Sequence, residues 1–239
     1  MSTEIIVALD VDTLKEEEAL LEKLHGTITH YKIGLRLFTA HGRKAVELVQ
    51  KKGGQVFLDL KFHDIPETVS QAVRQAHRLG VLSVSVHLWG GVEMLKAAAE
   101  VSPRPKLWGV TVLTSMAEED LRFIHPDLKV AETAAKLAKT GQANHVDGII
   151  CSAQEVAELR GLLGAATTFI TPGIRPADSA KDDQRRIVTP ADAAKLGIRY
   201  IVVGRPITKA ADPLKAAQAI VGEMRHAVPS SVEKEKARR

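Results

Sequence analysis

Two residues of opposite charge, Asp59 and Lys61, lie in the segment QVFLDLKFHDIP (55–66) at a spacing that suits chemistry on a polar substrate. Alternation along a strand sends both side chains to one side and those of Leu58 and Leu60 to the other. The leucines would face an apolar layer, so the carboxylate and the ammonium are expected to share a polar space. A surface ion pair in a loop is the alternative, but the leucines already account for the buried face.

Two later segments have the composition of phosphate-binding loops. TPGIR offers loop amides and Arg175, and GRPIT places Gly204 and Arg205 just before a helix that Pro206 can open. Glycine allows close backbone approach, and a helix N-terminus favours an anion. Together the two segments predict a phosphorylated ligand.

Short apolar, β-branched runs alternate with amphipathic stretches along the chain. Most are about 25 residues apart, which favours strands joined by crossover helices in a parallel sheet. The expected strands cover residues 5–10, 30–34, 55–60, 81–87, 107–113, 147–152, 167–173 and 200–205. Eight such units predict a single (β/α)8 TIM barrel. A doubly wound sheet is the second choice, because VALDVDTL lacks a glycine-rich first turn.

The helices expected between these strands carry their own signals. Residues 14–24 place Leu14, Leu21 and Leu24 near one face, and residues 66–80 begin with a proline and end on a glycine. The stretch 114–132 is the longest insertion and should contain a short extra helix. We expect one catalytic barrel domain over residues 1–228 and a charged, disordered tail over 229–239.

In a barrel of this type, active sites form where the strands end. Charged side chains are costly to bury there unless they are paired, so their concentration at one rim indicates a site. The polar residues at or near strand ends are Asp10, Lys32, Asp59, Lys61, His87, Thr114, Ser115, Gly204 and Arg205.

Composition excludes several other classes of protein. The net charge is +4, and half of this excess comes from the last ten residues, which argues against nucleic-acid binding. The only cysteine, Cys151, rules out an internal disulfide and a cysteine-based zinc site, and it is expected to be a buried thiol. The N-terminus lacks a secretion signal, and no apolar stretch is long enough to span a membrane, so a cytoplasmic protein is expected.

The motif DLKFHDIP and the blocks collinear with it closely resemble the orotidine 5'-phosphate decarboxylases. The other matching blocks are VALD, YKIG, VH, VTVLTS, CSAQE, TPGIR, DDQRRI and VVGRPIT, and the match runs from about residue 5 to about residue 222. The resemblance implies conversion of orotidine 5'-phosphate to uridine 5'-phosphate in pyrimidine biosynthesis. It also implies a homodimer that needs neither a metal nor another cofactor.

The resemblance also assigns roles to individual residues. It implies a charged array of Lys32, Asp59, Lys61 and Asp64, in which Lys61 donates the proton and Asp64 comes from the partner subunit. For substrate binding, it implies Asp10 and Lys32 at the ribose, Thr68 across the subunit interface, Thr114 and Ser115 at the pyrimidine, and Gln184, Gly204 and Arg205 at the phosphate, with Arg175 nearby. The polar segment 178–187 is the candidate lid.

Some residues depart from the family pattern or have an open role. Glu67 stands where many relatives have asparagine, and Leu88 and Trp89 follow His87 where a small residue is common, which leaves the packing of that loop in doubt. His63 is expected to be structural. His87 could either orient the charged array or pack at the rim.

Two other functions remain open. One is a magnesium-dependent sugar-phosphate decarboxylase or aldolase of the same superfamily, which would need a carboxylate on the second strand, where this chain has Lys32. The other is an inactive barrel that binds nucleotides, although no member of the charged array is missing. A structural or nucleic-acid-binding module is disfavoured, because the chain has neither a basic patch nor interleaved aromatic residues.

Overall fold

The computed structural model describes residues 2–176 and 188–227, and its strands form a closed barrel. Each strand pairs in parallel with the next, and β8 pairs with β1 to complete the ring. The strands are β1 (Glu4–Ala8), β2 (His30–Gly34), β3 (Gln55–Phe62), β4 (Ser83–His87), β5 (Lys106–Val110), β6 (Gly148–Ile150), β7 (Phe169–Thr171) and β8 (Tyr200–Val203). The predicted (β/α)8 architecture is confirmed, whereas the expected lid (178–187) and tail (229–239) lie outside the described residues.

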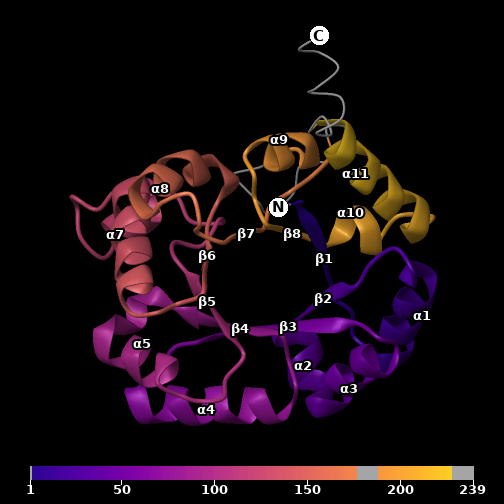
Figure 1. The fold of residues 1–239 in the computed structure, drawn as a ribbon, viewed down its shortest axis with the longest axis horizontal. Helices are drawn as coiled ribbons and strands as arrows, with labels where there is room; N and C mark the ends of the chain where they lie inside the picture. Colours follow the sequence, from indigo (N-terminus) through magenta and orange to yellow (C-terminus); the bar gives the residue numbers. More distant parts are fainter. Residues whose placement is uncertain (1, 177–187, 228–239) are drawn as a thin grey trace.

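Helices surround this barrel on all sides (Figure 1). They are α1 (Leu14–Leu24), α2 (Leu35–His41), α3 (Arg43–Lys51), α4 (Pro66–Arg78), α5 (Gly91–Ala99), α6 (Glu118–Arg122), α7 (Val130–Ala143), α8 (Val156–Leu163), α9 (Pro190–Lys195), α10 (Arg205–Thr208) and α11 (Pro213–Ala227), with short 3-10 turns at Leu88–Gly90 and Ala153–Glu155. The short helix expected within 114–132 is α6. Within the described ranges, no helix is long and apolar enough to cross a membrane.

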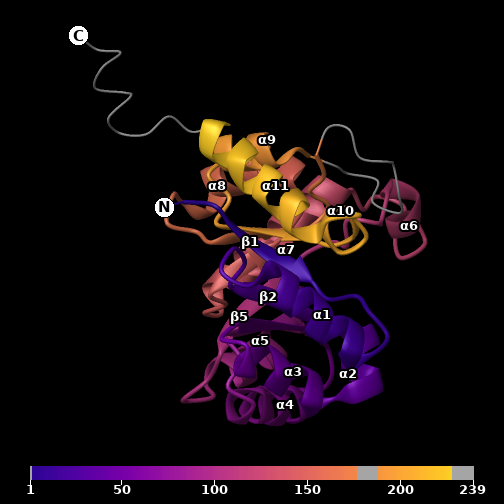
Figure 2. The same ribbon diagram turned by 90° about the vertical axis from the view of Figure 1, so that its right-hand side faces the viewer.

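The barrel has two ends, and Figure 2 shows the N-terminus and α6 at opposite ones. Since α6 follows the carboxyl end of β5, it marks the end at which the loops after the strands gather. The polar residues that follow the strands therefore converge on this face.

The interior of the barrel is filled by apolar side chains from alternate strand positions. They form one cluster: Ile6, Ala8, Phe57, Trp108, Val110, Ile150, Ile170, Tyr200 and Val202. Three of them are aromatic rings tilted against each other in a row, with centroids 4.6 Å apart for Phe57 and Trp108 and 5.1 Å apart for Trp108 and Tyr200. This packing closes the interior below the carboxyl end of the strands, so a ligand can enter from one side.

Helix α1 packs as predicted on its apolar face, with one exception. Leu21 and Leu24 are buried, and Leu14 is partly buried against the same cluster. Glu17, however, is fully buried on this face, and within the described residues neither of its carboxyl oxygens has a hydrogen-bond partner. Burial raises the pKa of Glu17 to about 8.

The unusual Leu88 after β4 has a defined place in the packing. It is buried, and it lies against Gly109 of β5 and Gly141 of α7. A Cβ at either glycine would come within 2.6 or 2.8 Å of the Leu88 side chain, which is too close. The two glycines therefore make the room that this large residue needs, and the departure from the family pattern is accommodated within the core.

Candidate active site

A cavity of about 330 Å³ opens at the carboxyl end of the strands. Its lower wall is apolar and includes side chains of the barrel interior, whereas its rim is polar. Nine predicted site residues line it: Asp10, Lys32, Asp59, Lys61, Thr114, Ser115, Arg175, Gly204 and Arg205. Residues from six of the eight strands or the loops that follow them thus meet in one place, which is the usual location of an active site in this fold.

Four of these residues form a chain of alternating charge across β1, β2 and β3. Lys32 Nζ lies 3.2 Å from an oxygen of Asp10 and 3.7 Å from an oxygen of Asp59. Lys61 Nζ donates hydrogen bonds to both oxygens of Asp59, at 2.9 and 3.0 Å. Each ammonium is thereby held next to a carboxylate, and the Lys61 end of the chain faces the cavity.

Asp59 lies between the two lysines, and its side chain is only 13% exposed. Burial by itself raises the pKa of its carboxyl group, but the charges of Lys32 and Lys61 and the hydrogen bonds from Lys61 and Ser85 outweigh burial. The net effect is a pKa below the usual value, so Asp59 is an anion at neutral pH. A fixed negative charge therefore lies beside the Lys61 ammonium.

The backbone at Lys61 is in an uncommon conformation. Its φ of 51° lies in the left-handed region, which costs a residue other than glycine on the order of 1–2 kcal/mol. The pairing of β3 with β4 shifts register between Leu58 and Phe62, at the same place. Simple strand alternation therefore predicted the correct side for Lys61, although the strand is not regular there.

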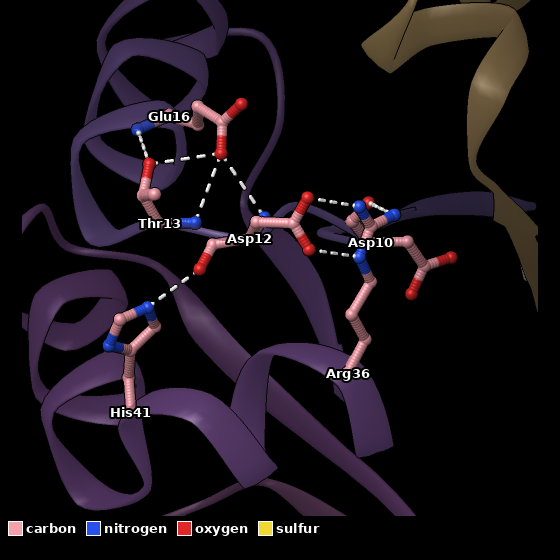
Figure 3. Close-up of polar contacts among 6 residues, drawn as sticks. All are labelled: Asp10, Asp12, Thr13, Glu16, Arg36 and His41. Atoms are coloured by element: carbon pink, nitrogen blue, oxygen red, sulfur yellow. Dashed lines mark hydrogen bonds and ion pairs between the residues drawn. The ribbon is translucent and has the colours of Figure 1, made fainter.

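Asp10 lies just after β1 at the start of a loop that Arg36 of α2 holds (Figure 3). Arg36 donates two hydrogen bonds to the carboxylate of Asp12, including one from Nε at 2.6 Å. A third, from Nη1, reaches the backbone carbonyl of Asp10 at 2.9 Å. A planar guanidinium can make all three bonds at once, and it thereby anchors the backbone that carries Asp10.

The far side of the same loop is held by two further residues, Glu16 and His41 (Figure 3). The carboxylate of Glu16 accepts hydrogen bonds from the backbone amides of Asp12 and Thr13, at 3.1 and 3.0 Å. Thr13 caps α1 in return by accepting the amide of Glu16. His41 Nε2 lies 2.8 Å from the carbonyl oxygen of Asp12. The loop after β1 is thus held by α1 and α2 together.

The opposite rim of the cavity carries the predicted anion-binding residues. Arg175, in the segment after β7, is nearly fully buried, and Gly204 and Arg205 join β8 to α10. A Cβ at Gly204 would meet Ala8 and Asp10 at 3.6 and 3.8 Å, which are ordinary contacts. The packing of the protein therefore tolerates a larger residue there, and glycine instead leaves the backbone open toward the cavity. Gln184, predicted to share this role, lies outside the described residues.

Two predicted site residues lie away from the cavity of this single chain. Asp64 is exposed in the loop after β3, where its carboxylate accepts the backbone amide of Ile65 at 2.6 Å. Thr68 is exposed on α4, and the apolar side chain of Ile65 next to them is 66% exposed.

The histidines near the charged chain stack on each other. The rings of His63 and His87 lie 5.3 Å apart at 29°. Burial, followed by the nearby His63 and Lys61, lowers the pKa of His87 to about 4, so it is neutral at pH 7. Within the described residues, Nδ1 of His87 has no hydrogen-bond partner. These facts favour packing at the rim over orientation of the charged chain.

Three residues with a part in this geometry were missed by sequence reasoning. Ser85 bonds to both Asp59 and the backbone of Lys61, Arg36 holds the loop of Asp10, and Gly34 leaves room for Lys32. The strand position of Ser85, on the same face as His87, was the available signal. Neither Arg36 nor Gly34 stands out by type or spacing.

The comparisons with known proteins agree with this geometry. Residues 3–220 match the model of the family described as Orotidine 5'-phosphate decarboxylase / HUMPS family. An orotidine 5'-phosphate decarboxylase of Saccharophagus degradans is 48% identical over 228 residues, which covers 94% of this chain and 96% of that relative. Another, from Laribacter hongkongensis, is 49% identical over 220 residues, or 90% of each chain.

Solved structures give the same result. The crystal structure of orotidine 5'-phosphate decarboxylase from Lactobacillus acidophilus superposes with a TM-score of 0.81 at 37% identity. The match covers 93% of this chain and 99% of that one.

Proposed function

The chain belongs to the orotidine 5'-phosphate decarboxylase / HUMPS family, and we infer that it decarboxylates orotidine 5'-phosphate to uridine 5'-phosphate and carbon dioxide. This reaction is the last step of UMP biosynthesis. The observation that carries the inference is the alternating chain Asp10–Lys32–Asp59–Lys61 at the edge of the cavity. We propose that these residues act without a metal or an organic cofactor.

In this proposal Lys61 is the proton donor. The bond between C6 of the pyrimidine and its carboxylate breaks, carbon dioxide leaves, and the electron pair stays on C6 in an orbital that the ring cannot delocalise. A fixed ammonium next to C6 stabilises this charge as it develops and then supplies a proton to it. Because Asp59 holds Lys61 Nζ by two hydrogen bonds, the ammonium is placed before the substrate arrives.

Asp59 has a second effect on the reacting group. It is an anion held beside Lys61, so a substrate carboxylate that approaches the same ammonium also meets a negative charge. Loss of carbon dioxide removes that repulsion and leaves the attraction between Lys61 and C6, which lowers the energy of the transition state relative to the bound substrate.

The remaining cavity residues would bind the parts of the substrate that do not react. Asp10 and Lys32 are proposed to hold the ribose hydroxyls, and Thr114 and Ser115 the pyrimidine. The phosphate is assigned to Gly204, Arg205, Arg175 and Gln184. Binding energy from the phosphate can be used to close and order the site around the reacting carbon.

The exposed positions of Asp64 and Thr68 support a site shared between two subunits of a homodimer. Both flank the exposed Ile65, so a second copy that covers this surface would bury an apolar side chain and bring new polar groups to the first copy. Mixing Lys61→Ala subunits with Asp64→Asn subunits tests this arrangement, because one site of each mixed dimer would be intact. Recovery of activity is expected, whereas an active monomer in sedimentation would refute it.

We also propose a cytoplasmic location, since the reaction joins soluble nucleotide metabolites, and a single catalytic domain over residues 1–228. Fractionation of cells into soluble and envelope material tests the location. Turnover by a chain truncated at residue 228 tests the extent of the domain.

The primary test follows the loss of orotidine 5'-phosphate absorbance with and without EDTA. Turnover should resist EDTA, and Lys61→Ala should lose at least about 100-fold in kcat. Turnover that EDTA abolishes would favour the magnesium-dependent sugar-phosphate enzymes, although Lys32 on β2 would repel a cation there. Absence of turnover with intact binding of UMP would favour an inactive nucleotide-binding barrel.

A further inference from the structure

Ser85 of β4 makes contacts that none of the roles assigned above requires. It is fully buried, and its side chain lies on the inward face of the barrel, two residues from His87. Its hydroxyl donates a hydrogen bond to Oδ1 of Asp59 at 2.8 Å and accepts one from the backbone amide of Lys61 at 2.8 Å. One hydroxyl thus joins the side chain of one charged residue to the main chain of the next.

The Lys61 amide needs this partner because the strand is irregular there. In the ladder between β3 and β4, Leu58 pairs with Val84 and Phe62 pairs with Val86, so four residues of β3 advance where β4 advances by two. In a regular parallel ladder, carbonyl oxygens of the neighbouring strand accept the amides. Here the Ser85 hydroxyl takes that place for Lys61, whose φ is 51°.

We propose that Ser85 is a positioning residue for the decarboxylation, and that its hydroxyl fixes the left-handed backbone at Lys61 relative to the Asp59 carboxylate. Without that link, the Lys61 backbone would be free to return toward the extended strand, and its ammonium would leave the place set by Asp59. Ser85 itself does not line the cavity, so it acts through these two neighbours. The proposal rests on the function assigned to Lys61 and Asp59.

The link also has an electrostatic consequence. Asp59 is flanked by Lys32 from β2, by Lys61 on its own strand and by Ser85 from β4, and Lys32 in turn contacts Asp10 after β1. Removal of the Ser85 hydroxyl takes one donor from the carboxylate, so the pKa of Asp59 rises. The acidic limb of the kcat/KM profile should then move to higher pH.

Ser83 provides a matched control. It lies two residues earlier on the same strand and the same face, and it is equally buried, but its hydroxyl has no hydrogen-bond partner within the described residues. Ser83→Ala therefore removes the same atom from the same face of the same strand, without touching Asp59 or Lys61.

The experiment compares Ser85→Ala and Ser83→Ala by steady-state kinetics from acid to neutral pH, together with thermal unfolding. Ser85→Ala should lose about 10- to 100-fold in kcat, since small displacements of a reacting group have effects of that size, while KM changes by less than about threefold. The acidic limb of its kcat/KM profile should move to higher pH. Ser83→Ala should match the wild type in kcat, in KM and in the position of this limb. Equal losses in both variants, or none in Ser85→Ala, would overturn the proposal.

A second pair isolates the hydroxyl if Ser85→Ala unfolds. Ser85→Thr keeps the hydroxyl, and Ser85→Val has nearly the same shape without it. The threonine variant should exceed the valine variant in kcat by at least about tenfold, and equal turnover would again overturn the proposal. Wild-type protein assayed alongside distinguishes a failure of the proposed function from a failure of the role proposed for Ser85. If the wild type itself does not decarboxylate orotidine 5'-phosphate, the proposed function fails, and if it does, the variants test Ser85 alone.

Discussion

The buried Glu17 of α1 predicts that the stability of the fold falls as pH rises. Its side chain is fully enclosed, and within the described residues neither carboxyl oxygen has a hydrogen-bond partner. Burial therefore raises the pKa of Glu17 from 4.5 to about 8. Replacement by methionine, which is similar in length and apolar, removes the ionisable group and keeps the packing.

The size of the effect follows from proton binding. Between pH 4.5 and about 8 the folded protein keeps the proton of Glu17, whereas the unfolded chain has released it. Folding then takes up a proton. The free energy of unfolding is therefore greatest below pH 4.5, and between pH 4.5 and about pH 8 it falls by about 1.4 kcal/mol per pH unit. From about pH 5 to about pH 7.5 the loss is about 3 kcal/mol, or roughly 6–12 °C in Tm for a chain of this length.

Thermal unfolding of the wild type and of Glu17→Met at these two pH values measures the effect. The advantage of the variant should grow by the stated amount between the acidic and the neutral buffer. Glu18→Gln is the control, because Glu18 lies next in sequence but is about half exposed and pairs with Lys52 at 3.1 Å. It should show no comparable change with pH. An advantage of Glu17→Met that is the same in both buffers would refute the view that Glu17 is buried in its neutral form.

Three further predictions concern the site. A Cβ at Gly34 would lie 2.7 Å from Lys32 Nζ, so Gly34→Ala should displace that ammonium. The variant should lose about 10- to 100-fold in kcat/KM with little change in Tm, and wild-type kinetics would contradict this. Arg36→Ala should raise KM about 3- to 10-fold by loosening the Asp10 carbonyl, and Arg36→Lys should not restore it, because lysine lacks the planar fork. The pKa of His87 is lowered to about 4, so His87→Phe should leave the pH profile of kcat/KM unchanged above about pH 5, and a shift there would show that His87 titrates in the active enzyme.

Much of the architecture could be predicted from short-range signals in the sequence. Runs of β-branched residues marked the strands, and Pro66 and Gly80 marked the ends of α4 closely, although the helix ends at Arg78. The convergence of Asp10, Lys32, Asp59 and Lys61 followed from the rule that parallel strands end at one face. These predictions succeeded because they depend on local periodicity and on a general property of the barrel.

The remaining features depend on contacts between distant parts of the chain. Glu17 occurs in a run of three glutamates and looks like an exposed helix residue, yet the tertiary fold turns it inward. Ser85 looks like an ordinary small strand residue, and its role appears once the irregularity at Lys61 is seen. The roles of Asp64 and Thr68 depend on a second subunit, so they stay predictions.

The row of aromatic rings beneath the cavity gives the protein a built-in optical reporter. Phe57 lines the cavity and contacts Trp108, and the chain has one other tryptophan, Trp89. In a Trp89→Phe variant, the indole emission would come from a single buried ring separated from the bound nucleotide by one phenyl group. The emission of that ring would follow substrate entry and product release in real time, without a label.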